Sequence, residues 1–481
     1  MKTFYNVNLT AWGRLCLLAA VAGFLATGCR TYQQQNKVVR EWRAGNLPGA
    51  VAEARSKAGK NVHNKDSIIW HLEAGAVLRA AGQYNDSNLV LDEAQAEIDA
   101  YAQKAKVRVA QEAGALLSNQ AELDYEGRAY DGIMLNTYKA LNYLALGDLD
   151  KARPELIRAY QRQQDAVEEN KKRIEKTQSA VEESKDRATI ERAQNDSKLQ
   201  SQLSASTANL EGVKVYADYV NPFTVYLDGL YFMANAADAS DLERAHKSFE
   251  RVAAFAPANS YVKDDLAAVD GLIQGHPLTP VTYVIFETGC APERGQIRVD
   301  IPIIVSRVSY VGAAFPTLSL QDNYQPSLMV SAGGGQVPAA TVASMDGIIS
   351  LDFKNELPVI ITKTIASTVT KAVAAYAIND AARSSGGSDV GLGNNIAGLL
   401  TQVATAAYQI AVNIADTRTW TTLPKEFQVA RLPTPADRKL EVFTPNGFRM
   451  AVTVGEGTVN VVYVKAISAT TPLLVSQFKL K

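Results

Sequence analysis

The stretch "YLALGDLDKARPELIRA", Tyr143 to Ala159, carries the pattern that decides the N-terminal fold. Gly147 separates two runs rich in Leu, Ala, Arg and Lys, which are residue types that favour helices. A glycine in this place commonly ends a helix with a positive φ. A small residue, Ala152, follows five places after the glycine, and a large apolar residue, Leu156, follows nine places after it. The stretch therefore predicts two antiparallel helices that approach closely after a tight turn.

The same pattern recurs in "WRAGNLPGAVAEA", which starts at Trp42, and in "LRAAGQYNDSNLVLDEA", which starts at Leu78. The copies align on Gly45, Gly82 and Gly147, and the wider second spacing suggests an altered unit between the last two. A fourth copy is "DLERAHKSFERVAAFAPAN", residues 241–259. The pattern resembles the tetratricopeptide repeat, so we expect a helical repeat domain over residues 29–275. The alternative is a non-repetitive helical bundle.

A highly charged stretch, residues 161–212, interrupts the repeats. Between Glu168 and Arg192, 14 of 25 residues are charged, seven of each sign. Apolar or small residues recur every seven places at Val167, Ile174 and Val181, but the other seam position is polar, so a coiled coil is poorly supported. We expect a long exposed helical insertion, single or folded back. A flexible charged linker is the alternative.

The residue composition changes at Val281, and residues 278–481 are expected to form a β-rich C-terminal domain. Runs such as "VTYVIFETG", "QIRVDIPIIV" and "TVNVVYVKAI" are β-branched and aromatic, and turn residues bound them. The fold class is therefore α+β and multidomain, with the helical domain first.

An apolar helical hairpin is expected inside the β-rich domain, over residues 357–416. Two Ala-rich segments, 357–383 and 394–416, flank the turn-like "SSGGSDVGLG". The second contains 25 consecutive residues without a charge, 391–415, which is long enough to span a bilayer. Transfer of its Asn, Gln and Thr side chains into the hydrocarbon of a bilayer would cost free energy, so packing on the β domain is favoured over membrane contact.

The N-terminus is typical of an export signal over residues 1–28. "LCLLAAVAGFLA", residues 15–26, is an uncharged apolar run that is too short for a span but suits a signal-peptide core. The run leads into "LATGC", which resembles a bacterial lipobox with Cys29 as the lipidated residue. Arg30, rather than Asp, follows the cysteine, which favours the outer membrane over the inner one. A plain secretory signal or an uncleaved anchor is the alternative.

Candidate chemistry is sparse. There are four histidines and, after removal of the signal and lipidation of Cys29, one thiol, Cys290. No metal site, cofactor site or catalytic motif is expected, and Cys290 is interpreted as a small buried residue rather than a reactive thiol. The net charge of −1 indicates no nucleic-acid surface. The protein is therefore not expected to be an enzyme.

Two sets of residues are candidate partner contacts. Arg418 and Trp420 lie in "DTRTWTTLP", residues 416–424, and Trp and Arg are typical interface anchors. The alternative is that Arg418 pairs with an acid while Trp420 packs against the sheet. Asn136, Tyr138 and Asn142 are expected to face the groove of the helical pairs, where a protein segment would bind.

The lipobox, "LNTYKALNYLALGD" (135–148), "YVIFETG" (283–289) and "DTRTWTTLP" together resemble a little-characterised family of bacterial lipoproteins with tetratricopeptide-like helices and a β-rich C-terminal region. The resemblance implies an envelope role, with some members associated with the regulation of cell-wall synthesis. We expect a lipid-anchored scaffold on the periplasmic face of the outer membrane that binds envelope proteins. The alternative is an envelope enzyme or glycan-binding module, which would bring Glu287, Glu293 and Asp416 together in a cleft.

Overall fold

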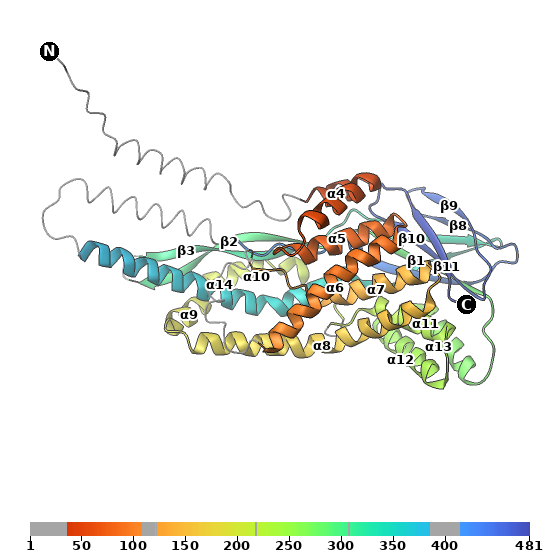
Figure 1. The fold of residues 1–481 in the computed structure, drawn as a ribbon, viewed down its shortest axis with the longest axis horizontal. Coiled ribbons are helices and arrows are strands. Elements are labelled where there is room, and N and C mark those ends of the chain that lie inside the picture. The colour runs from red at the N-terminus through yellow and green to blue at the C-terminus, as the bar shows by residue number, and fades with distance from the viewer. Residues whose placement is uncertain (1–35, 108–120, 122, 217–218, 306–307, 385–413) are drawn as a thin grey trace, which may run out of the picture.

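The computed structural model describes residues 36–107, 121, 123–216, 219–305, 308–384 and 414–481 (Figure 1). The predicted signal, Cys29 and most of the second hairpin segment lie outside these residues. The helices are α3 (Lys37–Arg43), α4 (Leu47–Lys60), α5 (Ser67–Ala80), α6 (Tyr84–Val107), α7 (Ala129–Ala145), α8 (Leu149–Glu182), α9 (Arg187–Gln194), α10 (Ser197–Ala205), α11 (Pro222–Ala234), α12 (Ala239–Phe255), α13 (Ser260–Ile273) and α14 (Met345–Ser384), with a short 3₁₀ turn at Ala208–Leu210.

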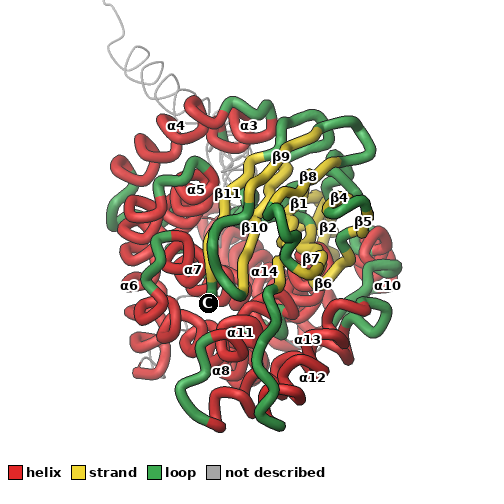
Figure 2. The backbone as a smooth tube through the Cα atoms, turned by 90° about the vertical axis from the view of Figure 1, so that its right-hand side faces the viewer, coloured by secondary structure: helices red, strands yellow, loops and turns green. Residues whose placement is uncertain are grey.

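The strands are β1 (Val281–Thr288), β2 (Glu293–Val305), β3 (Val308–Ser319), β4 (Met329–Ala332), β5 (Gly335–Pro338), β6 (Ala340–Ser344), β7 (Glu426–Pro433), β8 (Lys439–Phe443), β9 (Arg449–Thr453), β10 (Val459–Ala466) and β11 (Leu474–Lys479). The structure is therefore α+β, with helices first and a β-rich C-terminal region, as the sequence predicts. Figure 2 shows the strands gathered on one side of α5, α6 and α7.

The glycine turns form as predicted. Gly45, Gly82 and Gly147 follow α3, α5 and α7 with φ of 73°, 73° and 75°. Only glycine adopts this conformation without steric cost. The residue after Gly147, Asp148, caps the next helix, because its Oδ1 accepts a hydrogen bond from the Lys151 amide at 3.1 Å. The small residues five places after each glycine are buried: Ala50, Ser87 and Ala152 are all 0% exposed.

Part of the stretch between Gly82 and Gly147, where an altered unit is expected, lies outside the described residues. Within the described chain, α6 is 24 residues long, and α7 packs against both α5 and α6.

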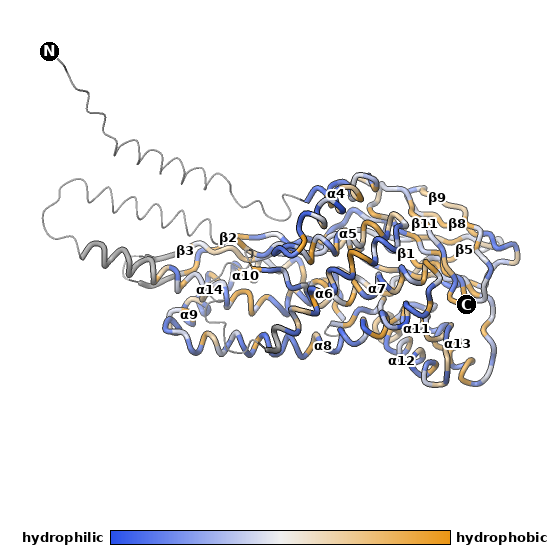
Figure 3. The backbone as a smooth tube through the Cα atoms, viewed as in Figure 1, coloured by the Kyte–Doolittle hydropathy of each residue, from blue (hydrophilic) through white to orange (hydrophobic). Residues whose placement is uncertain are grey.

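The charged stretch continues α8 to a length of 34 residues, and its outer face is hydrophilic along the lower edge of Figure 3. Val167 is 49% exposed, so the seven-residue spacing does not mark a seam. Beyond Glu182, α9 and α10 fold back and pack against the β2–β3 ribbon and α14. Their buried side chains, such as Ile190 and Leu203, form a core with Phe315 and Val369. We call this projection, made of the end of α8 with α9, α10, the ribbon and α14, the arm.

The β region contains a central sheet in the order β11-β10-β1-β7-β6 and an outer sheet in the order β5-β4-β8-β9. β1 pairs in parallel with β10 and antiparallel with β7. On β1, Tyr283 and Ile285 face the helices, while Val284 and Phe286 face the outer sheet. The layers are therefore helices, central sheet and outer sheet, and strands buried on both faces explain the continuous apolar runs.

The helices and the central sheet share one hydrophobic core. Leu135 and Leu141 of α7 belong to the same buried cluster as Ile285 and Val461 of the central sheet. Strands begin near the predicted boundary at residue 278, but that boundary does not separate two independent cores.

The first segment of the predicted hairpin is part of one longer helix, α14, which begins at Met345 rather than near Leu357 and carries Pro358 inside it. Residues 414–416, the end of the predicted second segment, are not helical, and residues 385–413 lie outside the described chain. Among the helices that the structure describes, none is long and apolar enough to cross a membrane.

Candidate functional site

Residues 416–424, "DTRTWTTLP", form a buried strap between the helices and the central sheet. The Arg418 guanidinium donates to Asp416 Oδ1 at 2.8 Å through Nε. Its Nη1 donates to the carbonyl oxygens of Lys65 and Leu123, both at 2.9 Å, and to Asp66 Oδ1 at 3.1 Å. Arg418 therefore ties the strap to the start of α5 and to the segment before α7. These contacts support the interpretation in which Arg418 pairs with acids of its own chain.

Trp420, at 0% exposure, packs edge-on against Tyr138 with ring centroids 5.7 Å apart. Its Nε1 donates to Thr422 Oγ1 at 3.0 Å. The next two residues satisfy a buried carboxylate, that of Glu73, with three hydrogen bonds. The donors are Thr421 N, Thr421 Oγ1 and Thr422 N, at 2.9, 2.6 and 3.1 Å. Trp420 is thus an anchor inside the chain, and its ring is closed to an external partner.

A second buried group, the Glu287 cluster, consists of Glu287, Lys465, Arg79, Tyr138 and Tyr463. Tyr138 and Tyr463 donate to the Glu287 carboxylate at 2.7 and 2.6 Å, and the Lys465 ammonium donates to its Oε1. The Arg79 guanidinium lies over the Tyr463 ring, 4.4 Å from its centroid. The cluster joins α5 and α7 to β1 and β10, and it holds two cations against one carboxylate.

Electrostatics follow from that arrangement. Burial raises the pKa of the Glu287 carboxyl, but Lys465 and Arg79 outweigh burial and hold the pKa below its usual value. Burial lowers the pKa of the Lys465 ammonium, and Glu287 only partly offsets this shift. The carboxylate is therefore committed to its two cations and is not available as a free acid or base.

A third group, the junction cluster, lies where the arm meets the body. Arg294 of β2 is 0% exposed and donates to Glu356 Oε2 of α14 at 2.7 Å. Arg128 Nε lies 3.4 Å from the same oxygen, and Arg173 Nη1 of α8 lies 3.3 Å from Glu356 Oε1. One carboxylate thus binds three guanidinium groups from three parts of the chain. These arginines hold the pKa of Glu356 well below its usual value, although burial alone would raise it.

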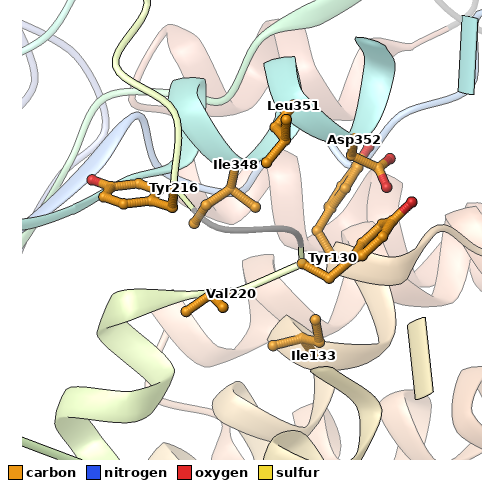
Figure 4. A pocket seen from close by; sticks show the side chains of 8 residues that line it. Tyr130, Ile133, Tyr216, Val220, Ile348, Leu351 and Asp352 are labelled. Carbon is orange, nitrogen blue, oxygen red and sulfur yellow. The ribbon is translucent and has the colours of Figure 1, made fainter. Parts of the chain in front are cut away.

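Asp352, one helical turn before Glu356, lines a small cavity at this junction with room for about one water molecule (Figure 4). The wall also includes Tyr130, Ile133, Tyr216, Tyr219, Val220, Ile348 and Leu351. Burial and the nearby Glu356 charge raise the pKa of Asp352 to about 7. Tyr219 adopts a φ of 59°, a conformation that is strained for a residue with a side chain.

Because the folded protein holds a proton on Asp352 that the unfolded chain releases near pH 4, stability should fall as pH rises from about 4 to about 7. Asp352→Asn should remove much of this loss, raising the melting temperature by roughly 2 °C or more at pH 8 and by less at pH 5. Thermal melts at both pH values check this. Glu250→Gln, at an exposed position on α12, is the control. A benefit that is equal at both pH values would contradict the assignment.

The acids proposed for a catalytic cleft are dispersed and paired. Glu287 pairs with Lys465, Glu293 lies 2.9 Å from Arg43 Nη1, and Asp416 binds Arg418. Within the described residues, no three His, Cys, Asp or Glu side chains lie together as a metal site would require. Cys290 is buried, and burial raises the pKa of its thiol. Glu287, Glu293 and Asp416 therefore do not converge in a cleft.

Asn136, Tyr138 and Asn142 do not face an open groove, so that expectation is wrong. Asn136 donates to Glu155 Oε2 at 2.5 Å and to Gln95 Oε1 at 3.0 Å, which links α7 to α8 and α6. Asn142 donates to Ser87 Oγ and Asn88 Oδ1, both at 2.9 Å. Tyr138 reaches the Glu287 cluster. Neighbouring helices therefore bury Asn136 and Asn142, and the central sheet buries Tyr138.

The sequence interpretation did not single out Arg128, Arg294 or Glu356. The sequence did contain a signal for the Glu287 cluster. Glu287 follows Tyr283 and Ile285 at every second position of one strand. Lys465 follows Val461 and Tyr463 in the same way on another, so both charges fall on the inward face of an apolar strand. Comparison with known proteins finds no matching family model, no similar curated protein and no similar solved structure. The resemblance to bacterial lipoproteins therefore stays a prediction from the residues quoted for it.

Proposed function

We propose that this chain is a lipid-anchored scaffold of the bacterial cell envelope that holds protein partners at the periplasmic face of the outer membrane. "LATGC" and the apolar run before it support the anchor. The paired helices with glycine turns support a tetratricopeptide-like origin for the helical part. The dispersed, ion-paired acids support a binding role rather than catalysis. An envelope-maintenance role follows from the resemblance alone.

The arm is the main observation that supports a binding role. It also changes the expected binding surface from the inner face of the helices to the outer face of α8. The central sheet occupies the inner face of the helices, so a partner has to use another surface. The arm projects from the body in Figure 1 with its own apolar core, and the outer face of α8 exposes charges of both signs along its length. A charged projection suits a partner with a complementary charged surface.

A photo-crosslinking residue at Lys172 on the arm tests this proposal in the full-length protein in cells. Lys247 on α12 of the body is a matched control. Both lysines pair with a glutamate four residues earlier, and their side chains are 67% and 69% exposed. We expect a discrete crosslinked protein from position 172 and at least several-fold less from position 247. Equal yields, or no discrete product from position 172, would count against the arm as the partner surface.

Cys29→Ala tests the anchor separately. We expect the mutant to lack acyl mass on its N-terminal peptide and to leave the membrane fraction on carbonate extraction, because the thioether-linked acyl chains supply the membrane affinity. The wild type should stay in the pellet. An unmodified Cys29 in the wild-type protein, or a mutant that remains in the pellet, would contradict lipid anchoring.

A further inference from the structure

The first two described helices carry an excess of positive charge. Residues 36–61, which contain α3 and α4, hold six basic and two acidic side chains, whereas the net charge of the whole chain is −1. Two of the six cations are committed to acids elsewhere in the body, since Arg43 pairs with Glu293 and Arg55 with Asp86. The other four are Lys37, Arg40, Lys57 and Lys60, which we call the tether-end patch.

The packing of α3 on α4 places the patch at the end of the helix pair where the chain enters. The two helices are joined by the Gly45 turn and run antiparallel, and Lys37 Nζ, at the start of α3, lies 3.4 Å from Glu53 Oε2. Helix α4 then continues for seven residues, roughly 10 Å, in the direction from which the chain enters α3. Lys57 and Lys60 therefore lie at the end of the pair where the described chain enters α3.

The patch is accessible. Lys37, Arg40 and Lys60 are exposed, and neither Arg40 nor Lys60 forms an ion pair with another described residue. Lys57 lies over the Trp70 ring, 5.1 Å from its centroid, and a cation–π contact keeps the charge of the ammonium. Of the two acids on these helices, Glu53 lies beside Lys37, and Glu41 accepts a hydrogen bond from Asn46 Nδ2 at 2.8 Å.

The tether is short. Lys37 lies eight positions after Cys29, so even a fully extended chain spans at most about 29 Å between them. If Cys29 is acylated, as the proposed function holds, the start of α3 stays within this distance of the bilayer surface. At that distance, the basic end of the α3–α4 pair is close enough to contact the lipid headgroups.

We propose that the tether-end patch binds anionic lipid headgroups of the bilayer that holds the Cys29 acyl chains, so that the body is docked on the membrane in one orientation. Each lysine or arginine near an anionic surface strengthens such binding roughly fivefold. The lipid confines the protein, and the patch orients it. Docking at this end would also give the arm a defined direction relative to the membrane.

Energy transfer in proteoliposomes tests the proposal with the intact mature lipoprotein. Gly59 of α4 is the labelling site, because it is exposed and an added Cβ would meet no heavy atom within 4 Å. A Gly59→Cys protein carries a donor fluorophore there, since Cys290 is buried. The vesicles carry headgroup acceptors and consist of phosphatidylcholine alone or with about 30% phosphatidylglycerol, an anionic lipid. Mass spectrometry first establishes the acyl chains on Cys29.

We expect transfer to be at least twofold higher in the anionic vesicles and to lose that excess in about 0.5 M salt, where screening is strong. Lys57→Gln combined with Lys60→Gln should abolish most of the excess, whereas Lys171→Gln combined with Lys172→Gln on the arm should leave it intact. Equal transfer in both lipids, or equal behaviour of the two double variants, would overturn the proposal. An unacylated Cys29 would instead refute the anchor, and mass spectrometry reports that separately.

Discussion

Glu287→Gln is expected to lower the free energy of unfolding by roughly 3–5 kcal/mol, because it leaves two buried cations without a counter-charge. Glutamine keeps the shape of the side chain, but Tyr138 and Tyr463 donate to different carboxylate oxygens, so the single amide oxygen can accept only one of the two hydroxyls. It cannot compensate the Lys465 ammonium or the Arg79 guanidinium, whose residues are 6% and 7% exposed. Chemical denaturation followed by circular dichroism measures the loss.

Two controls separate charge from packing in the Glu287 experiment. Glu441→Gln removes a carboxylate from an exposed cross-strand pair, Arg449–Glu441 at 3.0 Å, and should cost no more than about 1 kcal/mol. Glu287→Gln combined with Lys465→Met removes both charges and should recover part of the loss, since an apolar replacement of a buried pair is often tolerated. A single Glu287→Gln variant that is no less stable than Glu441→Gln would contradict the account of the cluster.

Trp420→Ala is the second large effect that we expect, at roughly 3–5 kcal/mol of lost stability. The indole is enclosed by α7 and the strap, so truncation leaves a cavity against Tyr138 that the surrounding elements cannot close. Denaturant midpoints and limited proteolysis of the strap measure the loss. The strap should become more susceptible to cleavage, because only polar contacts, such as those of Arg418 and Thr421, then tie it to the helices.

Trp420→Phe is the matched control. It keeps a ring against Tyr138 and loses the hydrogen bond from Nε1 to Thr422, so it should cost clearly less than the alanine variant. If phenylalanine and alanine were equally destabilising, the hydrogen bond rather than the buried ring would be the main contribution of Trp420, and the packing argument would fail.

Sequence reasoning reached the turns and the order of the elements because these depend on short-range chemistry. Gly147 needs a positive φ whatever surrounds it, and Val281 to Thr288 forms a strand because β-branched and aromatic residues suit a buried sheet. The same reasoning interpreted the charged segment from its composition. It could not tell that Val181 would be buried and Val167 exposed, since both sit in similar polar surroundings.

The candidate site depended on contacts that span the chain. Tyr138 and Glu287 are 149 positions apart, and Arg418 and Lys65 are 353 apart. No local pattern encodes such pairings, so the sequence could not show that Asn136 and Asn142 are buried by partners on α6 and α8. Arg294 likewise has no local signal in the sequence, because its partner on α14 lies 62 positions away.

Local residue patterns were thus sufficient for the helical pairs and the β-rich C-terminal region, because backbone preferences and hydrophobic periodicity act over a few residues, whereas the anchor at Cys29 stays a prediction. Folding in three dimensions settled three further matters: helices and central sheet share one core, the charged segment belongs to an arm, and the polar residues form buried ionic clusters. These features arise because buried charges must find partners wherever the packed chain brings them, and sequence distance does not limit that search.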